Sequence, residues 1–192
     1  MGYLNLIPER RGREESMSIN KKIREMTFVA IFVAVISVVS QIAIPTPTGV
    51  PITIQIFAIA LAGYYLDLKR ALLSILIYVL LGGIGVPVFS GFKGGFFVLI
   101  GPTGGFIWGF IIIVILCATF SKKALAIPMG IIATIVCHAF GVLQYMIISK
   151  IDFFRSAVLV SLPYIIKDIL LVIGAYYSCL KINRTINGKQ CD

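Results

Sequence analysis

Long runs of apolar residues, separated by short clusters of charge, constrain this chain more than any other feature. Because the hydrocarbon core of a bilayer is about 30 Å thick, a helix of roughly 20 apolar residues can span it. Of the 192 residues, 59% are hydrophobic and 13% are charged. A soluble domain usually has about a quarter of its residues charged. The pattern therefore predicts an all-α membrane protein.

Six segments have the apolar character of membrane-spanning helices: 26–44, 52–66, 71–86, 106–121, 124–149 and about 157–180. The stretch 87–105 is apolar but rich in Gly and Pro, which disfavours a straight helix. Non-helical backbone at membrane depth must be buried in protein or line a cavity. We therefore expect six transmembrane helices, with this Gly-rich loop folding over a pocket at the outer face.

The chain divides into a basic N-terminal segment, 1–25, a six-helix membrane domain, 26–180, and a basic tail, 181–192. Residues 1–16 lack the apolar core of a signal peptide. Met17 opens a more natural start that leads directly into the first apolar segment. We therefore expect residues 1–16 to form a disordered extension.

The positions of the basic residues predict the orientation of the chain. A net charge of +9 would suggest nucleic-acid binding in a soluble protein, but here the basic residues lie between apolar segments. Lys and Arg mark cytoplasmic loops. With a cytoplasmic N-terminus and six spans, only Lys93, Lys150 and Arg155 lie outside. The residues then inside are Arg10, Arg11, Arg13, Lys21, Lys22, Arg24, Lys69, Arg70, Lys122, Lys123, Lys181, Arg184 and Lys189.

This imbalance predicts that both termini are cytoplasmic in a multi-pass protein of the inner or plasma membrane. Three loops, at 46–49, 87–105 and 150–156, then share the outer face. A ligand that arrives from outside would enter there.

Lys167 and Asp168 are charged residues inside the last apolar segment. A charge at the centre of a membrane helix costs on the order of 3 kcal/mol and usually faces a cavity or a partner. Two alternatives are that the pair neutralises itself or lies shallow enough to reach the interface. Adjacent helical residues point about 100° apart, so we expect poor pairing and favour a role in ligand binding for both.

Other polar residues and glycines allow two interpretations each. Thr53 and Gln55 need hydrogen-bond partners in hydrocarbon, which a ligand or a neighbouring helix can supply. The glycines of 94–95 and 101–105 allow either a close approach of backbone to ligand or tight helix packing. His138, the only histidine, is more typical of a hydrogen-bonded packing residue than of a catalyst.

The chain lacks the motifs of catalysis and ATP binding. There is no HExxH, no P-loop, no carboxylate pair and no Ser beside a usable His. Cys117, Cys137, Cys179 and Cys191 form no CxxC pair and no metal-ligand spacing. We therefore expect a protein that is not an enzyme, without disulfide, metal or cofactor, and an ATPase on another subunit if transport is ATP-driven.

Four stretches resemble the BioY family, the biotin-specific S components of energy-coupling factor (ECF) importers, and the resemblance covers about 26–180. They are 50–58 (VPITIQIFA), 81–95 (LGGIGVPVFSGFKGG), 99–110 (LIGPTGGFIWGF) and 162–168 (LPYIIKD). The resemblance implies a subunit without ATPase activity that captures biotin near the outer surface. It also implies docking onto a transmembrane coupling protein and two cytoplasmic ATPases.

In such proteins an AxxxA face on the first helix contacts the coupling protein. Ala30 and Ala34 have that spacing, although in an Ala-rich helix it also arises by chance. Biotin chemistry assigns Asp168 as acceptor for the ureido N–H groups, aromatic side chains as walls, and Lys93 with nearby glycines as the carboxylate site. The candidate ligand-binding residues are Asp168, Lys167, Thr53, Gln55, Tyr78, Phe89, Lys93, Gly94, Gly95, Phe97 and Thr103.

One departure concerns the last helix. Many members of the family have a lysine three residues after the aspartate, where this chain has Leu171. Lys167 lies four residues before that position, on the same helical face, and could serve from one turn away. The alternatives are an S component for another vitamin, a membrane enzyme or a stand-alone carrier, although we find no internal repeat of the carrier type.

Overall fold

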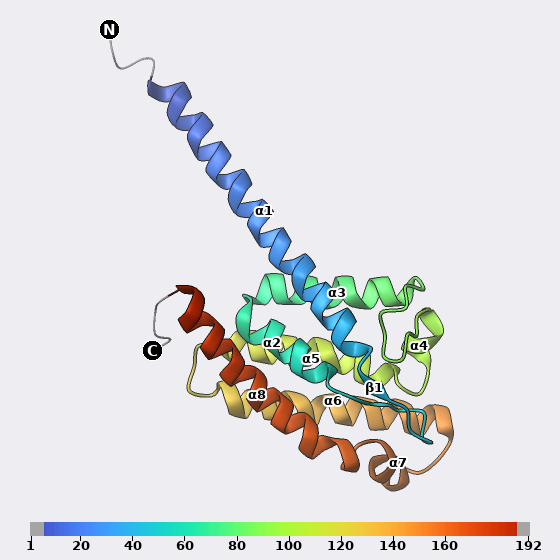
Figure 1. The fold of residues 1–192 in the computed structure, drawn as a ribbon. Helices are drawn as coiled ribbons and strands as arrows, with labels where there is room; N and C mark the ends of the chain where they lie inside the picture. The colour runs from blue at the N-terminus through green and yellow to red at the C-terminus, as the bar shows by residue number, and fades with distance from the viewer. Residues whose placement is uncertain (1–5, 188–192) are drawn as a thin grey trace.

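The computed structural model describes the backbone of residues 6–187 and the side chains of residue 17 and residues 19–185, and almost all of it is helical. The helices are α1 Leu6–Ser40, α2 Gln55–Tyr65, α3 Leu68–Gly83, α4 Phe96–Ile100, α5 Gly104–Phe120, α6 Ala126–Ser149, α7 Phe153–Val160 and α8 Leu162–Asn187. Two short antiparallel strands, β1 Ala43–Ile44 and β2 Ile52–Thr53, connect α1 to α2 (Figure 1).

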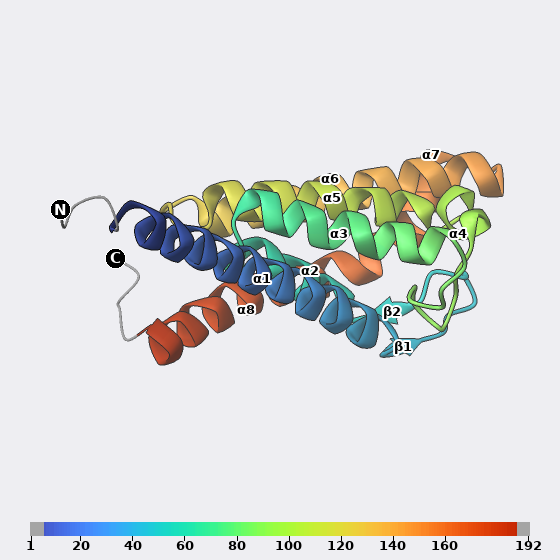
Figure 2. The ribbon, with the colours of Figure 1, turned by 90° about the horizontal axis from the view of Figure 1, so that it is seen from above.

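The longer helices form one bundle, in which α2 contacts α5 and α8, and α6 contacts α5 and α8. α1 runs along α2 and α3 and then extends beyond them (Figure 1). Figure 2 shows the first turn of α1 and the last turn of α8 at one end of the bundle. The strands, α4 and α7 lie at the opposite end, so the loops that the sequence predicts to be external lie together.

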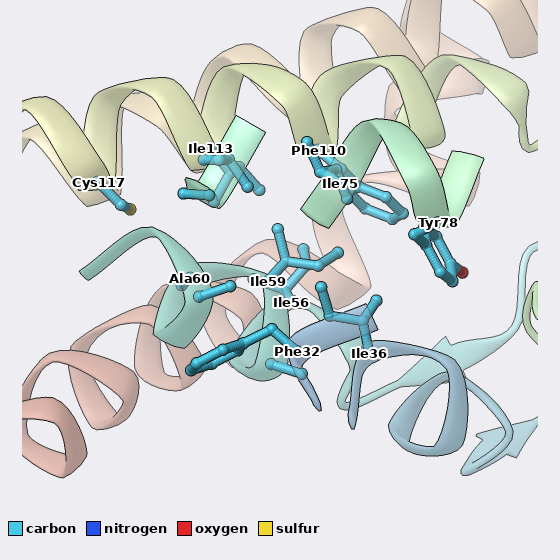
Figure 3. Close-up of a cluster of buried hydrophobic side chains, with 14 of the residues drawn as sticks. Phe32, Ile36, Ile56, Ile59, Ala60, Ile75, Tyr78, Phe110, Ile113 and Cys117 are labelled. Carbon is cyan, nitrogen blue, oxygen red and sulfur yellow. The ribbon is translucent and has the colours of Figure 1, made fainter. Parts of the chain in front are cut away.

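The core lies where α1, α2, α3 and α5 meet. Ile36, Ile59, Ile75 and Ile113 are fully buried there, one from each helix (Figure 3). Tyr78 packs at the edge of this cluster, and Figure 3 shows its hydroxyl on the side away from the apolar side chains. The apolar core therefore ends where a polar region of the bundle begins.

Glycines bring α5 and α6 close together. A Cβ atom on Gly109 would lie 2.7 Å from the Cα of Cys137, and one on Gly105 would lie 2.3 Å from the carbonyl oxygen of Phe140. Real Cβ atoms do not approach backbone that closely, so only glycine fits at these two positions. Gly105, which ends the Gly-rich 101–105 stretch, thus serves helix packing.

The outer surface of the bundle is apolar. Val38, Leu80, Ile147 and Ile166 are each more than 60% exposed. Exposed apolar area of this extent fits contact with lipid rather than water. Within the described residues, Ile19–Ser40 and Ala126–Ser149 are long and apolar enough to cross a bilayer, and the bent pair α7–α8 would be a third. The prediction of an all-α membrane protein is confirmed, and the count of six spans stays a prediction.

Two expected spans differ from the helices observed. The segment 26–44 leaves the helix after Ser40, because its last residues pair with β2. The segment 157–180 is broken at Ser161, where α7 and α8 meet at 51°. Pro163 lies in the first turn of α8, a position that suits proline because it has no backbone N–H to donate.

The Gly-rich and N-terminal segments also contain helix that the sequence did not predict. The stretch 87–105 includes the short helix α4 between its two glycine clusters. Residues 6–16, which the sequence predicted to be a disordered extension, continue α1 as helix. Residues 1–5 and 188–192 lie outside the described residues, so the division into three segments stays a prediction.

Candidate ligand-binding site

A pocket opens among α2, α3, α5, α6 and α8, at the end of the bundle that carries the two strands. It holds about 680 Å³ of empty space, part of which is open to the outside. Eight of the eleven residues that the sequence predicted for ligand binding line it: Asp168, Lys167, Thr53, Gln55, Tyr78, Phe89, Lys93 and Thr103.

Asp168 is the buried charge of the pocket, and both of its oxygens have partners. Its Oδ1 contacts the ammonium of Lys167, and its Oδ2 lies 3.1 Å from Nε2 of His138. Lys167 also donates to the backbone oxygen of Thr53, 2.5 Å away. The expectation that Lys167 and Asp168 would pair poorly was wrong, because the flexible stem of the lysine folds back onto its neighbour.

His138 connects this carboxylate to the α7–α8 corner. Its Nδ1 lies 3.0 Å from Oγ of Ser161, the residue at the break between the two helices. The ring edge also packs against Phe106 of α5, with ring centroids 5.6 Å apart. Sequence reasoning found no serine beside this histidine because the two are 23 positions apart and meet only through the bend.

Gln55 and Tyr78 form a second polar group, opposite α8. The Gln55 amide donates to the Tyr78 hydroxyl at 2.8 Å, and that hydroxyl donates to the Val88 carbonyl at 3.2 Å. Both side chains are buried and line the pocket. The sequence allowed either a neighbouring helix or a ligand as the partner of Gln55. Its amide bonds to the neighbouring helix α3, and its side chain also faces the cavity.

A tight hairpin, residues 89–93, closes one side of the pocket. Phe89 and Lys93 exchange backbone hydrogen bonds of 2.9 and 3.2 Å. The Phe89 ring packs over Gly82 and meets Tyr78 edge-on, with ring centroids 5.5 Å apart. Phe89 and Lys93 both line the pocket, and among the described residues Lys93 has no acidic partner. The hairpin therefore supplies one aromatic wall and one unpaired cation.

Ser90, in the same hairpin, was not predicted. Within the described part of the chain, its Oγ is the only buried side-chain N or O atom that has no hydrogen-bond partner. A buried hydroxyl without a partner costs about 1–3 kcal/mol. Ser90 lines the pocket, so a polar atom of a ligand is the partner that would satisfy it.

Three predicted residues do not line the pocket. Phe97 is 83% exposed on α4. Gly95 donates its N–H to the carbonyl oxygen of Gly82 at 2.6 Å. A Cβ on Gly94 would lie 2.5 Å from the carbonyl oxygen of Val86. The two glycines therefore hold the hairpin against the end of α3.

Taken together, a helical membrane body with a pocket that combines charged, polar and aromatic groups defines a membrane protein that binds a small molecule. Its fold matches a crystal structure titled as the S-component for biotin from an ECF-type ABC transporter, with a TM-score of 0.79. The match covers 86% of this chain and 93% of the other at 24% sequence identity. This likeness establishes the S-component fold.

The chain belongs to the BioY family, whose model matches residues 13–188. A "probable biotin transporter BioY" of Pyrococcus horikoshii is 37% identical, over 78% of this chain and 90% of that protein. The "biotin transporter BioY" of Thermotoga maritima is 33% identical, over 84% and 96% respectively. The "biotin transporter BioY2" of Lactococcus lactis is 33% identical, over 79% and 85%. The resemblance found in the sequence is confirmed.

Proposed function

We propose that this chain is the substrate-binding membrane subunit of a biotin importer, which captures biotin at the outer face and delivers it together with an ATP-driven ECF module. The observation that carries the proposal is a buried carboxylate, Asp168, in a pocket whose far side holds an unpaired cation, Lys93. Membership of the BioY family and the names of three relatives support it. The role is that of a transporter subunit rather than an enzyme.

The ureido ring of biotin matches the α8 side of the pocket. The ring offers two N–H donors and one carbonyl acceptor. Asp168 can accept from the N–H groups, and Lys167 or Gln55 can donate to the carbonyl. Thr53 brings its side chain to the pocket wall and its backbone oxygen to Lys167. Such paired donors and acceptors reject ligands that would leave a buried group unpaired.

The rest of the ligand matches the hairpin side. Tyr78 and Phe89 offer flat apolar surface for the sulfur-containing ring and the aliphatic tail. Lys93 and the Ser90 hydroxyl can receive the carboxylate, since both donate and neither is engaged by another described side chain. A nanomolar dissociation constant corresponds to about −12 kcal/mol, which a preorganised pocket can supply for a ligand of this size.

The same proposal includes the membrane topology and the partners. We infer six spans, cytoplasmic N- and C-termini in the plasma membrane, and an outer-face pocket covered by the Gly-rich 87–105 segment. Ala30 and Ala34 are exposed on one face of α1, where the transmembrane coupling protein of the ECF module would dock. Two cytoplasmic ATPase subunits complete the importer.

The direct test is to purify the protein, release its small molecules and identify them by mass spectrometry, and then to titrate the emptied protein with biotin. We expect Asp168→Asn to weaken biotin binding at least tenfold, because it removes the charged acceptor. Its thermal unfolding should show a folded protein. Recovery of another vitamin would replace the proposed ligand, and unchanged affinity in Asp168→Asn would remove this residue from the site.

A matched control is Asp152→Asn. Asp152 lies at the N-cap of α7, where its carboxylate accepts from the backbone N–H of Arg155 at 3.1 Å. Asn caps helices about as well as Asp, and Asp152 does not line the pocket. This variant should therefore bind biotin as the unmodified protein does.

A further inference from the structure

We propose that His138 positions the Asp168 carboxylate for ligand binding. This rests on the proposed function only in that biotin is the ligand. The proposal gives His138, which the sequence indicated to be a packing residue, a part in ligand capture.

The geometry determines which ring nitrogen carries the proton. The His138 and Asp168 side chains are 3% and 7% exposed. An ionised carboxylate only accepts hydrogen bonds, so the Nε2 that lies 3.1 Å from Asp168 must carry a proton. In the neutral ring Nδ1 is then an acceptor, and the Ser161 hydroxyl at 3.0 Å donates to it. The Asp168 carboxylate thereby selects the tautomer whose Nε2–H donates to it, and Ser161 holds the opposite ring nitrogen.

Few other charges face His138. The ring edge meets Phe106 from α5, which is uncharged, and the Cys137 thiol points to the Phe106 backbone oxygen at 3.6 Å. The α7–α8 corner contributes the neutral hydroxyl of Ser161. Helix α8 contributes Asp168 and also Lys167, which contacts Asp168 and carries the opposite charge. His138 therefore meets the Asp168 carboxylate with no competing charged acceptor among these neighbours.

The positioning role can be measured without any ligand. The chain has one histidine, so protein labelled with ¹⁵N-histidine and purified through a histidine-free tag gives one imidazole in NMR spectra. At pH 8.5 we expect Nε2 to be protonated and Nδ1 to be bare, and Asp168→Ala to weaken this preference. The opposite tautomer, or an equal mixture of both, would overturn the positioning role.

The positioning role also predicts an effect on binding, which is tested by titrating biotin into two variants. His138→Gln is the rescue variant, because its amide can donate to Asp168 and accept from Ser161, and it should bind biotin within about threefold of the unmodified protein. His138→Phe, which keeps the ring packing and loses both hydrogen bonds, should bind roughly tenfold more weakly or worse.

Equal affinity of His138→Phe and the unmodified protein would overturn the part of His138 in ligand capture. An unmodified protein that binds no biotin would instead refute the proposed function, and the tautomer measurement would still decide the positioning role. Thermal unfolding of each variant shows whether a loss of binding reflects a loss of fold.

Discussion

At the scale of single residues, the polar groups of the pocket differ in whether the protein itself satisfies them. Asp168 has a partner on each oxygen, whereas the Ser90 hydroxyl has none among the described residues. A satisfied group keeps its orientation when the pocket is empty. An unsatisfied group gains a hydrogen bond only when a ligand arrives. That bond therefore contributes to the free energy of binding and not to the stability of the empty protein.

Ser90→Ala should therefore lower biotin affinity by roughly five- to thirtyfold and leave the unfolding temperature nearly unchanged. The substitution removes a donor that the empty protein does not use. Equilibrium titration and thermal unfolding measure the two effects separately.

Ser74→Ala is the matched control for Ser90→Ala. Ser74 is fully buried on α3, its hydroxyl donates to the backbone oxygen of Arg70 at 2.9 Å, and it does not line the pocket. This variant should keep its affinity for biotin. Equal affinity of the two variants would show that Ser90 does not contact the ligand.

Without the family resemblance, the sequence indicates most clearly those site residues whose energetic cost is visible along the chain. Lys167 and Asp168 stand out because charge is rare and expensive in an apolar segment. His138 and Ser161 do not, since a lone histidine has many roles and its partner is brought to it by a helix break. Ser90 resembles any loop serine until the structure shows that its hydroxyl is buried without a partner.

At the scale of the helices, α1 has two distinct faces. Val29, Phe32 and Ile36 are buried against the bundle, whereas Ala30 and Ala34 are exposed one turn apart. Small side chains on an exposed helix face let a second helix approach closely within a membrane. The face therefore suits a membrane-embedded partner, and the ligand pocket lies elsewhere.

Ala34→Leu should leave biotin binding by the isolated subunit unchanged and reduce biotin uptake by cells that contain the whole importer by tenfold or more. The larger side chain holds the partner helix away from α1. Uptake of labelled biotin and titration of the purified subunit distinguish the two effects.

Ala139→Leu, at an exposed position of α6, makes the same change on another helix and should not affect uptake. Normal uptake with Ala34→Leu would show that this face is not the docking surface.

The existence of most elements was predictable from apolar periodicity, but their ends were not. α2 begins at Gln55 because the two residues of β2 pair back to β1, a contact between segments that no local pattern reveals. The break at Ser161 likewise lies inside one continuous apolar stretch. Both interruptions lie at the pocket end, where the fold departs from straight helices.

At the scale of the whole molecule, basic residues form two groups, one at each end of the bundle. Lys69 begins α3 and Lys123 lies in the α5–α6 connection, both at the end where α1 starts (Figure 2). Lys150 and Arg155 flank the start of α7 at the pocket end. The structure places these two groups of basic residues at opposite ends, in agreement with the orientation that we propose.

This orientation can be checked by cysteine labelling of intact cells with a membrane-impermeant maleimide, in a background with Cys191→Ser. Lys150→Cys and Arg155→Cys should react in intact cells. Lys69→Cys and Lys123→Cys should react only after the membrane is opened. The reverse pattern would contradict cytoplasmic termini.

The Val88 carbonyl, next to the pocket residue Phe89, is a shared acceptor: Gln41 donates to it at 3.1 Å and Tyr78 at 3.2 Å, and the Ser40 hydroxyl lies within reach. Three side chains, from the last residue of α1, the residue after it and α3, thus reach a single backbone atom that a side-chain substitution cannot remove. Losing one donor leaves two in place, so single substitutions at this junction should look mild and combined ones disproportionately severe. A substitution at any one of the three sites would then be tolerated, and the Val88 carbonyl would lose its hydrogen bonds only when all three donors are removed.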